Sequence, residues 1–283
     1  MRYLVISDIH SNVQALSEVL KIKEKINVDK VICLGDIVGY NANPQECYEI
    51  CKTFCDFNIM GNHDLLASLE NIGYREERKW SKDALDGMYH TKASINEECI
   101  KWLKELHYAD VIEDSGVAIH LTHGAPYTSI FDDGDFPYLL SSYEAKTNSD
   151  YCKENKVYLS LFGHTHIPTF VKQTNDYIES DFSIEGIKTN VFNIGGDGEI
   201  KFDLSEAFEK KAVFLINPGS VGQARGGGNV SFGILDTEEK TFEFCPFSYN
   251  YKKAVQAVRD IGYSKRIAER LEPTHDILNF KWS

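Results

Sequence analysis

The stretch Arg2-Tyr3-Leu4-Val5-Ile6-Ser7-Asp8-Ile9-His10 joins a short apolar run to two polar side chains. The run from Arg2 to Ser7 is rich in aromatic and β-branched residues, which predicts a buried first strand. The strand is expected to end at Asp8 and His10. An acidic residue and a histidine directly after a buried strand are the first indication of a polar site.

A helix is predicted to follow this strand. Ser11-Asn12-Val13-Gln14 matches a capping box, with Ser11 as the N-cap residue and Gln14 three positions later. The helix is expected to place its apolar side chains on one stripe, comprising Val13, Leu16, Val19 and Leu20.

The same order of strand and helix then recurs. A second strand is predicted for Lys30–Leu34, ending at Gly35-Asp36, and Pro44 is expected to open a helix that continues to about Phe54. A third strand is predicted for Asp56–Met60, ending at Gly61-Asn62-His63-Asp64. Strands and helices that alternate at these lengths favour an α/β fold with a parallel sheet.

The remainder of the chain changes character. Residues 76–107 are expected to be mostly helical, residues 127–140 form a predicted loop, and helices are expected at about 250–261 and 264–271. The strands predicted here are Val117–Thr122, Val157–Phe162, Thr169–Gln173, Thr189–Ile194, Ala212–Ile216, Ser231–Asp236 and Thr241–Pro246, mostly antiparallel from Thr169 onward. We expect one domain spanning residues 1–283, with insertions around 74–110 and 174–211.

Composition limits the classes of function. Apolar residues make up 42% of the 283 positions, which is enough for a sizeable core, and the formal net charge is −13. An acidic surface repels nucleic acid and anionic membranes, so neither is an expected partner. No run approaches the roughly 20 apolar residues of a membrane span. The seven cysteines lack a disulfide framework, and Cys47, Cys51 and Cys55 are interpreted as reduced thiols of a cytoplasmic protein.

Five polar motifs share one feature, because each directly follows a predicted strand. They are Asp8-x-His10, Gly35-Asp36, Gly61-Asn62-His63-Asp64, His123-Gly124 and Gly163-His164-x-His166. Parallel sheets gather ligands at the carboxyl ends of their strands, so these motifs can meet at one point. Glycines in four of the motifs suit tight turns and close approach of the backbone.

The residue types indicate metal chemistry. Carboxylate, imidazole and amide oxygen together suit divalent ions such as Mn, Fe, Zn, Ni or Co. The candidate ligands are Asp8, His10, Asp36, Asn62, His123, His164 and His166. Seven ligands exceed what one such ion takes and suit two ions that share a carboxylate. Two ions about 3.5–4 Å apart form a clamp for displacement at phosphorus.

Each motif alone has a simpler interpretation. Asp8-x-His10 can be a strand-to-helix cap, Gly35-Asp36 an ordinary turn, and Asn62 the N-cap of a helix. The histidines of Gly163-His164-x-His166 are more specific, since residues two apart project to the same side of an extended chain. The occurrence of all five motifs in order at strand ends favours a common site.

The ordered set resembles the calcineurin-like metallophosphoesterase superfamily, whose pattern is D-x-H, G-D-x-x-x, G-N-H-[DE], H and G-H-x-H. The resemblance runs from residue 1 to about 236 and includes Asn217-Pro218-Gly219-Ser220-Val221-Gly222, similar to a late turn in the small bacterial and archaeal branch. Gly39-Tyr40 and Pro44 also resemble that branch. The family implies a two-sheet β-sandwich flanked by helices, in four layers of α/β/β/α.

The resemblance also implies roles for the ligands. One metal ion would be held by Asp8, His10, Asp36 and His166, and the other by Asp36, Asn62, His123 and His164, with a bridging hydroxide that attacks phosphorus. Manganese is the favoured metal. His63 would be the general acid that protonates the leaving oxygen, and Asp64 would orient it. Histidine is the usual proton donor near neutral pH.

Three further residues are candidates for binding substrate. The branch commonly has Gly-Asn after D-x-H, whereas this chain has Ser11-Asn12; Asn12 can donate to a phosphate oxygen or cap the helix. Arg225 can bind phosphate or belong to a hairpin turn, and Tyr40 can line the site or pack at the surface. His90, His107, His120 and His275 lie outside the motifs and are interpreted as structural, with His120 a possible neighbour of the site.

The sequence therefore predicts a phosphoesterase acting on phosphomonoesters or phosphodiesters, in a small molecule or a phosphoprotein. The alternative from another class is a catalytically weak, metal-binding scaffold of the same fold that mediates protein interaction. The complete ligand set favours the enzyme. A nuclease is disfavoured, because the chain lacks a basic patch with interleaved aromatic residues.

Overall fold

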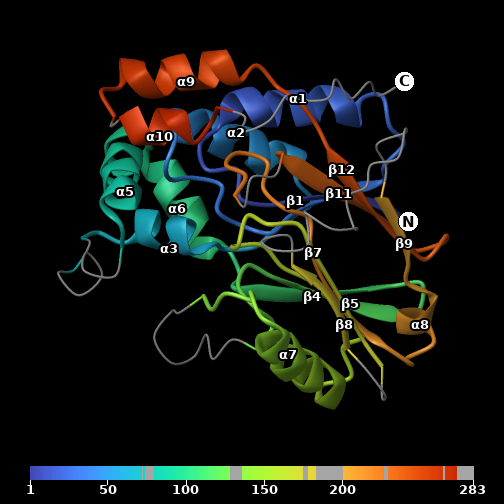
Figure 1. Cartoon of the computed structure of the whole chain (residues 1–283). Coiled ribbons are helices and arrows are strands. Elements are labelled where there is room, and N and C mark those ends of the chain that lie inside the picture. Colours follow the sequence, from blue (N-terminus) through green and yellow to red (C-terminus); the bar gives the residue numbers. More distant parts are fainter. Residues whose placement is uncertain are drawn as a thin grey trace.

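The computed structural model describes residues 1–71, 73, 80–127, 136–174, 178–182, 200–225, 229–263 and 265–272. It contains two six-stranded sheets (Figure 1). In spatial order, the first comprises β3 (Phe57–Asn58), β2 (Lys30–Cys33), β1 (Arg2–Ile6), β11 (Ser231–Asp236), β12 (Thr241–Pro246) and β9 (Ile200–Asp203). The second comprises β4 (Ala109–Asp114), β5 (Val117–Thr122), β6 (Leu159–Leu161), β10 (Val213–Asn217), β7 (Thr169–Gln173) and β8 (Ile178–Phe182).

Each sheet has a parallel half and an antiparallel half. β1, β2 and β3 are parallel, with Tyr3 opposite Lys30, and β5, β6 and β10 are parallel in the other sheet. The remaining strands join antiparallel, as β11 does beside β1. The polar motifs follow the parallel strands, so their side chains are delivered at strand ends. In Figure 1, β1 runs from the N-terminus toward the end of the sandwich where α3 (Asn62–Ser68) and α5 (Lys82–Ser94) lie.

Alternation along β1 shows how the layers are built. Tyr3 and Val5 pack in the cluster between the two sheets, whereas Leu4 and Ile6 pack in the cluster beneath the helices. The helices over the first sheet include α1 (Val13–Lys23) and α2 (Pro44–Phe54), and α7 (Ser142–Glu154) covers the second sheet (Figure 1). The predicted four-layer arrangement is confirmed.

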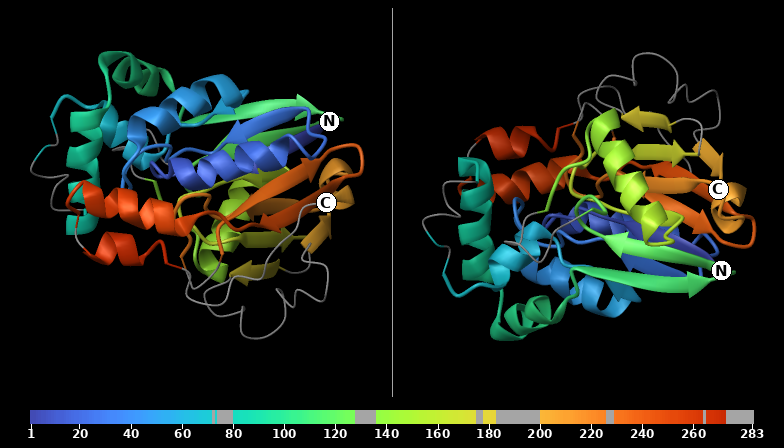
Figure 2. Two further views of the ribbon diagram at one scale, coloured as in Figure 1. Left: turned by 90° about the horizontal axis from the view of Figure 1, so that it is seen from above. Right: turned by 90° about the horizontal axis from the view of Figure 1, so that it is seen from below.

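Four further helices are described. They are α6 (Glu97–Glu105), α8 (Ser205–Phe208), α9 (Tyr251–Asp260) and α10 (Lys265–Glu269). Two turned views place α5, α9 and α10 together at one end of the sandwich (Figure 2). A small apolar cluster joins α9 to α10 through residues such as Val258 and Ile267.

The predicted start of α1 was wrong by one residue. The N-cap is Asn12, whose Oδ1 accepts a hydrogen bond from the Ala15 backbone at 3.1 Å, and not Ser11. Ser11 adopts a left-handed backbone with φ of 57°, which leaves its hydroxyl unable to serve as the predicted cap. The buried stripe of α1 is accordingly Ala15, Leu16, Val19 and Ile22.

Several elements were not predicted. β4 and α7 were missed, and the predicted insertion at 174–211 contains β8, β9 and α8. Within residues 76–107 the described part forms α5 and α6. The predicted strand Thr189–Ile194 lies outside the described residues. β3 covers only Phe57–Asn58, and Ile59 forms a separate bridge with His107.

All seven cysteines are free thiols in the structure, and Cys47 and Cys51 are fully buried against the first sheet. Within the described part of the chain, none of the helices combines the length and the apolar character that a membrane crossing requires. Cys55 is the C-cap residue of α2, so only Cys47 and Cys51 of the three neighbouring cysteines lie within the helix.

We predict that His120 makes the fold sensitive to acid. Its Nδ1 lies 3.0 Å from the Ser160 hydroxyl, and burial lowers the pKa of this imidazole to about 4. As pH falls, the unfolded chain takes up this proton near pH 6.5 while the folded chain resists until about pH 4. The contribution of neutral His120 to the free energy of unfolding is therefore fully present above the unfolded pKa. It declines below that pKa, by about 2 kcal/mol between pH 8 and pH 5.

His120→Gln removes the titration but can keep a hydrogen bond to Ser160. Urea unfolding at both pH values should show a smaller loss in the variant than in the natural protein. Equal losses in the two proteins would exclude this role of His120.

Candidate metal centre

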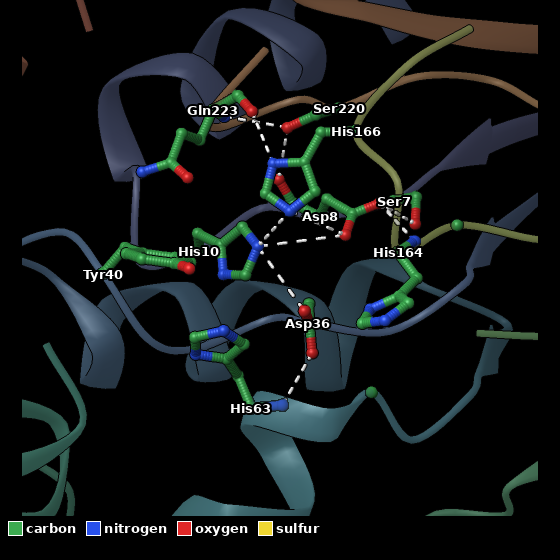
Figure 3. A network of polar contacts seen from close by, with 12 residues as sticks. Ser7, Asp8, His10, Asp36, Tyr40, His63, His164, His166, Ser220 and Gln223 are labelled. Atoms are coloured by element: carbon green, nitrogen blue, oxygen red, sulfur yellow. Dashed lines mark hydrogen bonds and ion pairs between the residues drawn. The ribbon is translucent and has the colours of Figure 1, made fainter. Parts of the chain in front are cut away.

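The turns after five strands bring the predicted ligands together. Asp8 and His10 follow β1, Asp36 follows β2, and Asn62 begins α3 just after β3. His123 follows β5, and His164 and His166 follow β6. All are buried except Asn62, which is partly exposed. Figure 3 shows His10, Asp36, His164 and His166 directed toward a common centre.

The first group comprises Asp8, His10, Asp36 and His166. Nε2 of His10 lies 2.9 Å from Nε2 of His166 and 3.5 Å from Oδ2 of Asp36. Oδ1 of Asp8 lies 3.4 Å from Nε2 of His166 and 3.8 Å from Nε2 of His10. Four ligand atoms thus face one another at the distances that a shared cation would require.

The second group comprises Asp36, His123 and His164. Nε2 of His123 lies 3.2 Å from Oδ2 of Asp36 and 3.1 Å from Oδ1 of Asn62. The side chain of Asn62 therefore extends this group to four. Oδ2 of Asp36 is close to both groups, so a single carboxylate oxygen lies between His10 and His123.

The hydrogen bonds of the histidines fit metal ligands. The Nδ1 atoms of His10, His123 and His166 lie 3.2, 2.7 and 2.6 Å from the backbone oxygens of Val38, Leu34 and Gln223. Nδ1 must donate in each of these contacts, which leaves Nε2 as the ligand atom. In neutral His10 and His166 the two Nε2 lone pairs would face one another across 2.9 Å. A cation between them resolves this conflict.

The carboxylates are oriented by their second oxygens. Oδ2 of Asp8 accepts hydrogen bonds from the Ser7 hydroxyl at 2.7 Å and from the His164 backbone at 3.1 Å. Oδ1 of Asp8 is fully buried and has no hydrogen-bond partner among the described residues. Oδ1 of Asp36 accepts from the His63 backbone at 2.8 Å. An orphaned carboxylate oxygen in a buried site is costly unless a cation accompanies it, so these donors fit a metal.

The backbone is strained where the ligands lie. Five predicted ligands have left-handed conformations, with φ of 53° for Asp8, 49° for His10, 54° for Asp36, 68° for His164 and 60° for His166. Such conformations in residues other than glycine cost of order 1–3 kcal/mol each and gather at functional sites. Turning these side chains inward therefore lowers the stability of the folded state.

Burial sets the charge of the imidazoles. It lowers the pKa of His10 to about 4 and that of His164 to about 3, and it holds the pKa of His166 well below its ordinary range. These three imidazoles are therefore neutral near neutral pH, which is the form that binds metal.

Asp36 and His123 behave as a pair. Burial opposes charge on both, yet the attraction between them outweighs it, raising the pKa of His123 to about 9 and holding that of Asp36 well below its usual range. Burial raises the pKa of Asp8 to about 7. Without a metal, the proton on His123 supplies the positive charge that Asp36 requires.

His63 lies beside the ligands without belonging to either group. Its ring contacts His10 at 4.7 Å, Tyr40 at 4.7 Å and Trp80 at 4.5 Å between centroids. In the described part of the chain, its buried Nδ1 has no hydrogen-bond partner. Figure 3 shows the imidazole next to the ring of His10, while the His63 backbone bonds to Asp36. Burial lowers its pKa well below the ordinary range, while the charge of Asp36 acts in the opposite direction.

The carboxylate of Asp64 bonds to backbone amides beside the site, and within the described residues it forms no hydrogen bond with the imidazole of His63. Its Oδ1 accepts from the Ile37 and Val38 backbones at 2.9 and 3.1 Å, and its Oδ2 accepts from the Gly61 backbone at 3.0 Å. These bonds join the turn after β2 to the start of α3. The N-cap of α3 is Gly61, so the capping interpretation of Asn62 is wrong.

The three substrate candidates differ in their surroundings. Asn12 caps α1, and its Nδ2 donates to the Gly222 oxygen at 2.9 Å and the Tyr249 hydroxyl at 3.1 Å, so its polar atoms are engaged within the protein. The capping interpretation accounts for Asn12. The Tyr40 ring contacts His10 at 4.8 Å between centroids, and Nη2 of Arg225 donates to the Tyr40 hydroxyl at 3.4 Å. Both side chains lie beside the centre.

Sequence reasoning missed several neighbours of the site. Ser7 and Gln223 hold Asp8 and His166, and Ser220 donates to the Asp8 backbone oxygen at 2.8 Å. The ring of Tyr138 stacks on His164 with centroids 4.0 Å apart. Ser220 belongs to the turn 217–222, which the family resemblance had already included. Tyr138 lies in a segment without any motif.

Comparisons with known proteins agree with this geometry. A family model described as the calcineurin-like phosphoesterase superfamily domain matches residues 1–240. Protein MJ0912 of Methanocaldococcus jannaschii is 31% identical over 272 residues, covering 94% of this chain and 96% of that relative.

Two solved structures extend the comparison. A metallophosphoesterase from Sphaerobacter thermophilus has a TM-score of 0.70 and 26% identity, covering 96% of this chain and 98% of that chain. A hypothetical protein from Pyrococcus horikoshii, PH1004, has a TM-score of 0.69 at 18% identity, covering 98% of this chain and 99% of that chain, and shares the fold.

We predict that Gly61 is required for the position of Asp36. A Cβ atom at Gly61 would lie 2.1 Å from Oδ1 and 2.2 Å from the backbone nitrogen of Asp36. Gly61→Ala must therefore displace the carboxylate that both groups share. Titration calorimetry of metal-stripped protein should show Mn²⁺ affinity reduced by about tenfold or more, equivalent to about 1.4 kcal/mol.

Gly73→Ala is the matched control, since a Cβ there would meet no atom of the described residues within 4 Å. Natural Mn²⁺ affinity in Gly61→Ala would contradict this account of the centre.

Proposed function

Because the chain belongs to the calcineurin-like phosphoesterase superfamily, we propose that it hydrolyses phosphate esters with two divalent metal ions that share Asp36. The single observation that carries the proposal is Oδ2 of Asp36, which lies 3.5 Å from Nε2 of His10 and 3.2 Å from Nε2 of His123. One carboxylate oxygen between two sets of ligands can bridge two metal ions. A single ion would not require the second set.

Asp8, His10, Asp36 and His166 would hold the first ion, and Asp36, Asn62, His123 and His164 the second. When bound, such ions neutralise the charge on a phosphoryl group and lower the pKa of a nucleophilic water. Manganese suits this mixed set of imidazole, carboxylate and amide ligands, as do iron, zinc, nickel and cobalt.

The protein's own groups would then prepare the reaction. Ser7 and the His164 backbone fix Asp8, while the His63 backbone fixes Asp36. These bonds hold the ligands in position before substrate arrives, which reduces reorganisation during the reaction.

His63 is the group proposed to donate a proton to the leaving oxygen. Its Nδ1 has no partner among the described residues, and its ring is held between Tyr40 and Trp80. A bound phosphate adds negative charge, which acts in the same direction as Asp36 and favours the protonated imidazole.

The alternative is a catalytically weak scaffold, in which the centre would bind metal and the protein would mediate protein interaction. Nothing in the donor set favours it, because both groups of ligands and a free imidazole nitrogen are present together. The two proposals differ in a measurable way.

The test of the proposal is hydrolysis of a panel of phosphoesters by metal-stripped protein, reloaded with each divalent ion in turn. We expect metal-dependent turnover with at least one ion, strongest with Mn²⁺. Asp36→Asn should abolish it and weaken metal binding at both sites together. A reloaded protein that binds metal but hydrolyses none of the panel would favour the scaffold.

We predict that the effect of His63→Ala depends on the leaving group. A proton donor contributes about 10²–10⁴-fold in rate, and mostly when the leaving oxygen is basic. The variant should keep its metal and lose most of its kcat on alkyl phosphates. The loss of kcat should be much smaller on p-nitrophenyl phosphate, because p-nitrophenolate leaves without being protonated.

His90→Ala is the matched control, because His90 bonds to the Ala42 oxygen away from the centre. The informative readout is kcat plotted against the pKa of the leaving group. A loss of the same size for every ester, accompanied by loss of metal, would make His63 a structural residue.

A further inference from the structure

Metal binding does not explain the presence of Arg225 beside the site. Its backbone nitrogen lies 3.4 Å from the His166 oxygen, so the loop between β10 and β11 carries it past the first group of ligands. The side chain is only partly exposed. Among the described residues no carboxylate forms an ion pair with it. A cation close to two proposed metal sites and without an anionic partner is unfavourable unless an anion binds beside it.

The position of the guanidinium follows from its two tyrosine neighbours. Nη2 donates to the Tyr40 hydroxyl, and the Tyr40 ring contacts His10 and His63. Tyr138 also lies beside the guanidinium, and its ring stacks on His164 of the second group. The guanidinium is therefore placed between residues that touch each of the two groups. An anion bound between the two groups of ligands would therefore have the guanidinium of Arg225 beside it.

The donors of Arg225 are largely free. A guanidinium has five N–H donors, and within the described chain its hydrogen-bond partners are the hydroxyls of Tyr40 and Tyr138. Neutral hydroxyls are weak acceptors for a guanidinium, which prefers two oxygens of a phosphate or carboxylate. Burial opposes its charge, yet Tyr40, Tyr138 and Asp8 outweigh burial and keep the pKa of Arg225 above its ordinary value.

Charge decides which phosphate ester suits this arrangement. Two divalent ions carry four positive charges, and Asp8 and Asp36 offset two of them. Arg225 raises the remaining charge to three. A phosphomonoester is a dianion with three terminal oxygens, whereas a phosphodiester is a monoanion with two. Two ions can engage two oxygens, and only the monoester has a third oxygen, with its additional charge, for Arg225.

We propose that Arg225 binds the third terminal oxygen of a phosphomonoester and makes this centre selective for phosphomonoesters over phosphodiesters. Tyr40 and Tyr138 are positioning residues, which hold the guanidinium over the two metal sites. This inference rests on the proposed function, since it assumes that both ions and the phosphoryl group bind where described.

Binding of two unreactive probes tests the proposal apart from activity. Methylphosphonate carries two negative charges in mildly alkaline buffer, and its monomethyl ester carries one. Titration calorimetry with the Mn²⁺-loaded protein should show tighter binding of the dianion. Arg225→Gln should weaken methylphosphonate binding roughly 10- to 100-fold, as expected for a lost charge-assisted hydrogen bond. Binding of the singly charged monomethyl ester, which stands for a phosphodiester, should change by less than about threefold.

Arg259→Gln is the matched control, because Arg259 lies on α9 and pairs with Glu272 at the surface. Arg225→Lys keeps the charge but loses the planar fork, so it should retain part of the preference for the dianion. Metal content and the unfolding midpoint of each variant show whether it folds and stays loaded.

Three results separate the claims. Equal weakening of both probes by Arg225→Gln, or no weakening of either, would overturn the role of Arg225 and leave the phosphoesterase proposal intact. Failure of the natural, metal-loaded protein to bind either probe would instead overturn the phosphate site itself. A dianion preference that persists in Arg225→Gln would show that the metal ions alone provide it.

Discussion

The carboxylate of Asp36 is shared by two sets of imidazoles, and the arrangement of the surrounding structure follows from this sharing. Its Oδ2 faces His10 and His123, while its Oδ1 is held by the His63 backbone. A buried carboxylate in this position requires positive charge, which the proton on His123 provides in the metal-free protein. Two cations would satisfy the same requirement more completely. The site is therefore electrostatically prepared for metal before any metal binds.

Holding this carboxylate in place imposes demands on distant parts of the chain. Gly61 must lack a side chain, because a Cβ there would overlap Asp36. Asp64 ties the turn after β2 to the start of α3, and the 217–225 segment supports Asp8 and His166 through Ser220 and Gln223. Parallel strands of both sheets contribute ligands, so the sandwich is what brings them to one centre. The left-handed turns at the ligands are the cost of that convergence.

Much of this was predictable from the sequence, because the motifs directly follow apolar strands whose periodicity is clear. The positions of Asp8, Asp36 and His164 at strand ends follow from that pattern alone. Other features depend on contacts that no local pattern reports. Asn12 replaced Ser11 as the cap of α1 because the chain bends sharply at Ser11, and bonds from Asn12 to Gly222 and Tyr249 cross more than half the chain.

The missed elements have similar causes. α7 is a polar helix that packs only a few residues, such as Ala145 and Cys152, against the second sheet, so its apolar periodicity is weak. β4 is an edge strand whose side chains are partly or fully exposed, which removes the usual alternation. Tyr138 became recognisable only when its stacking on His164 placed it at the site.

Anomalous diffraction from crystals of the Mn²⁺-loaded protein would test the central claim most directly. The account predicts two peaks about 3.5–4 Å apart, one on each side of Oδ2 of Asp36. The first should lie within bonding distance of His10 and His166, and the second within bonding distance of His123 and His164. A single peak at full occupancy, or two peaks that do not share Asp36, would contradict it.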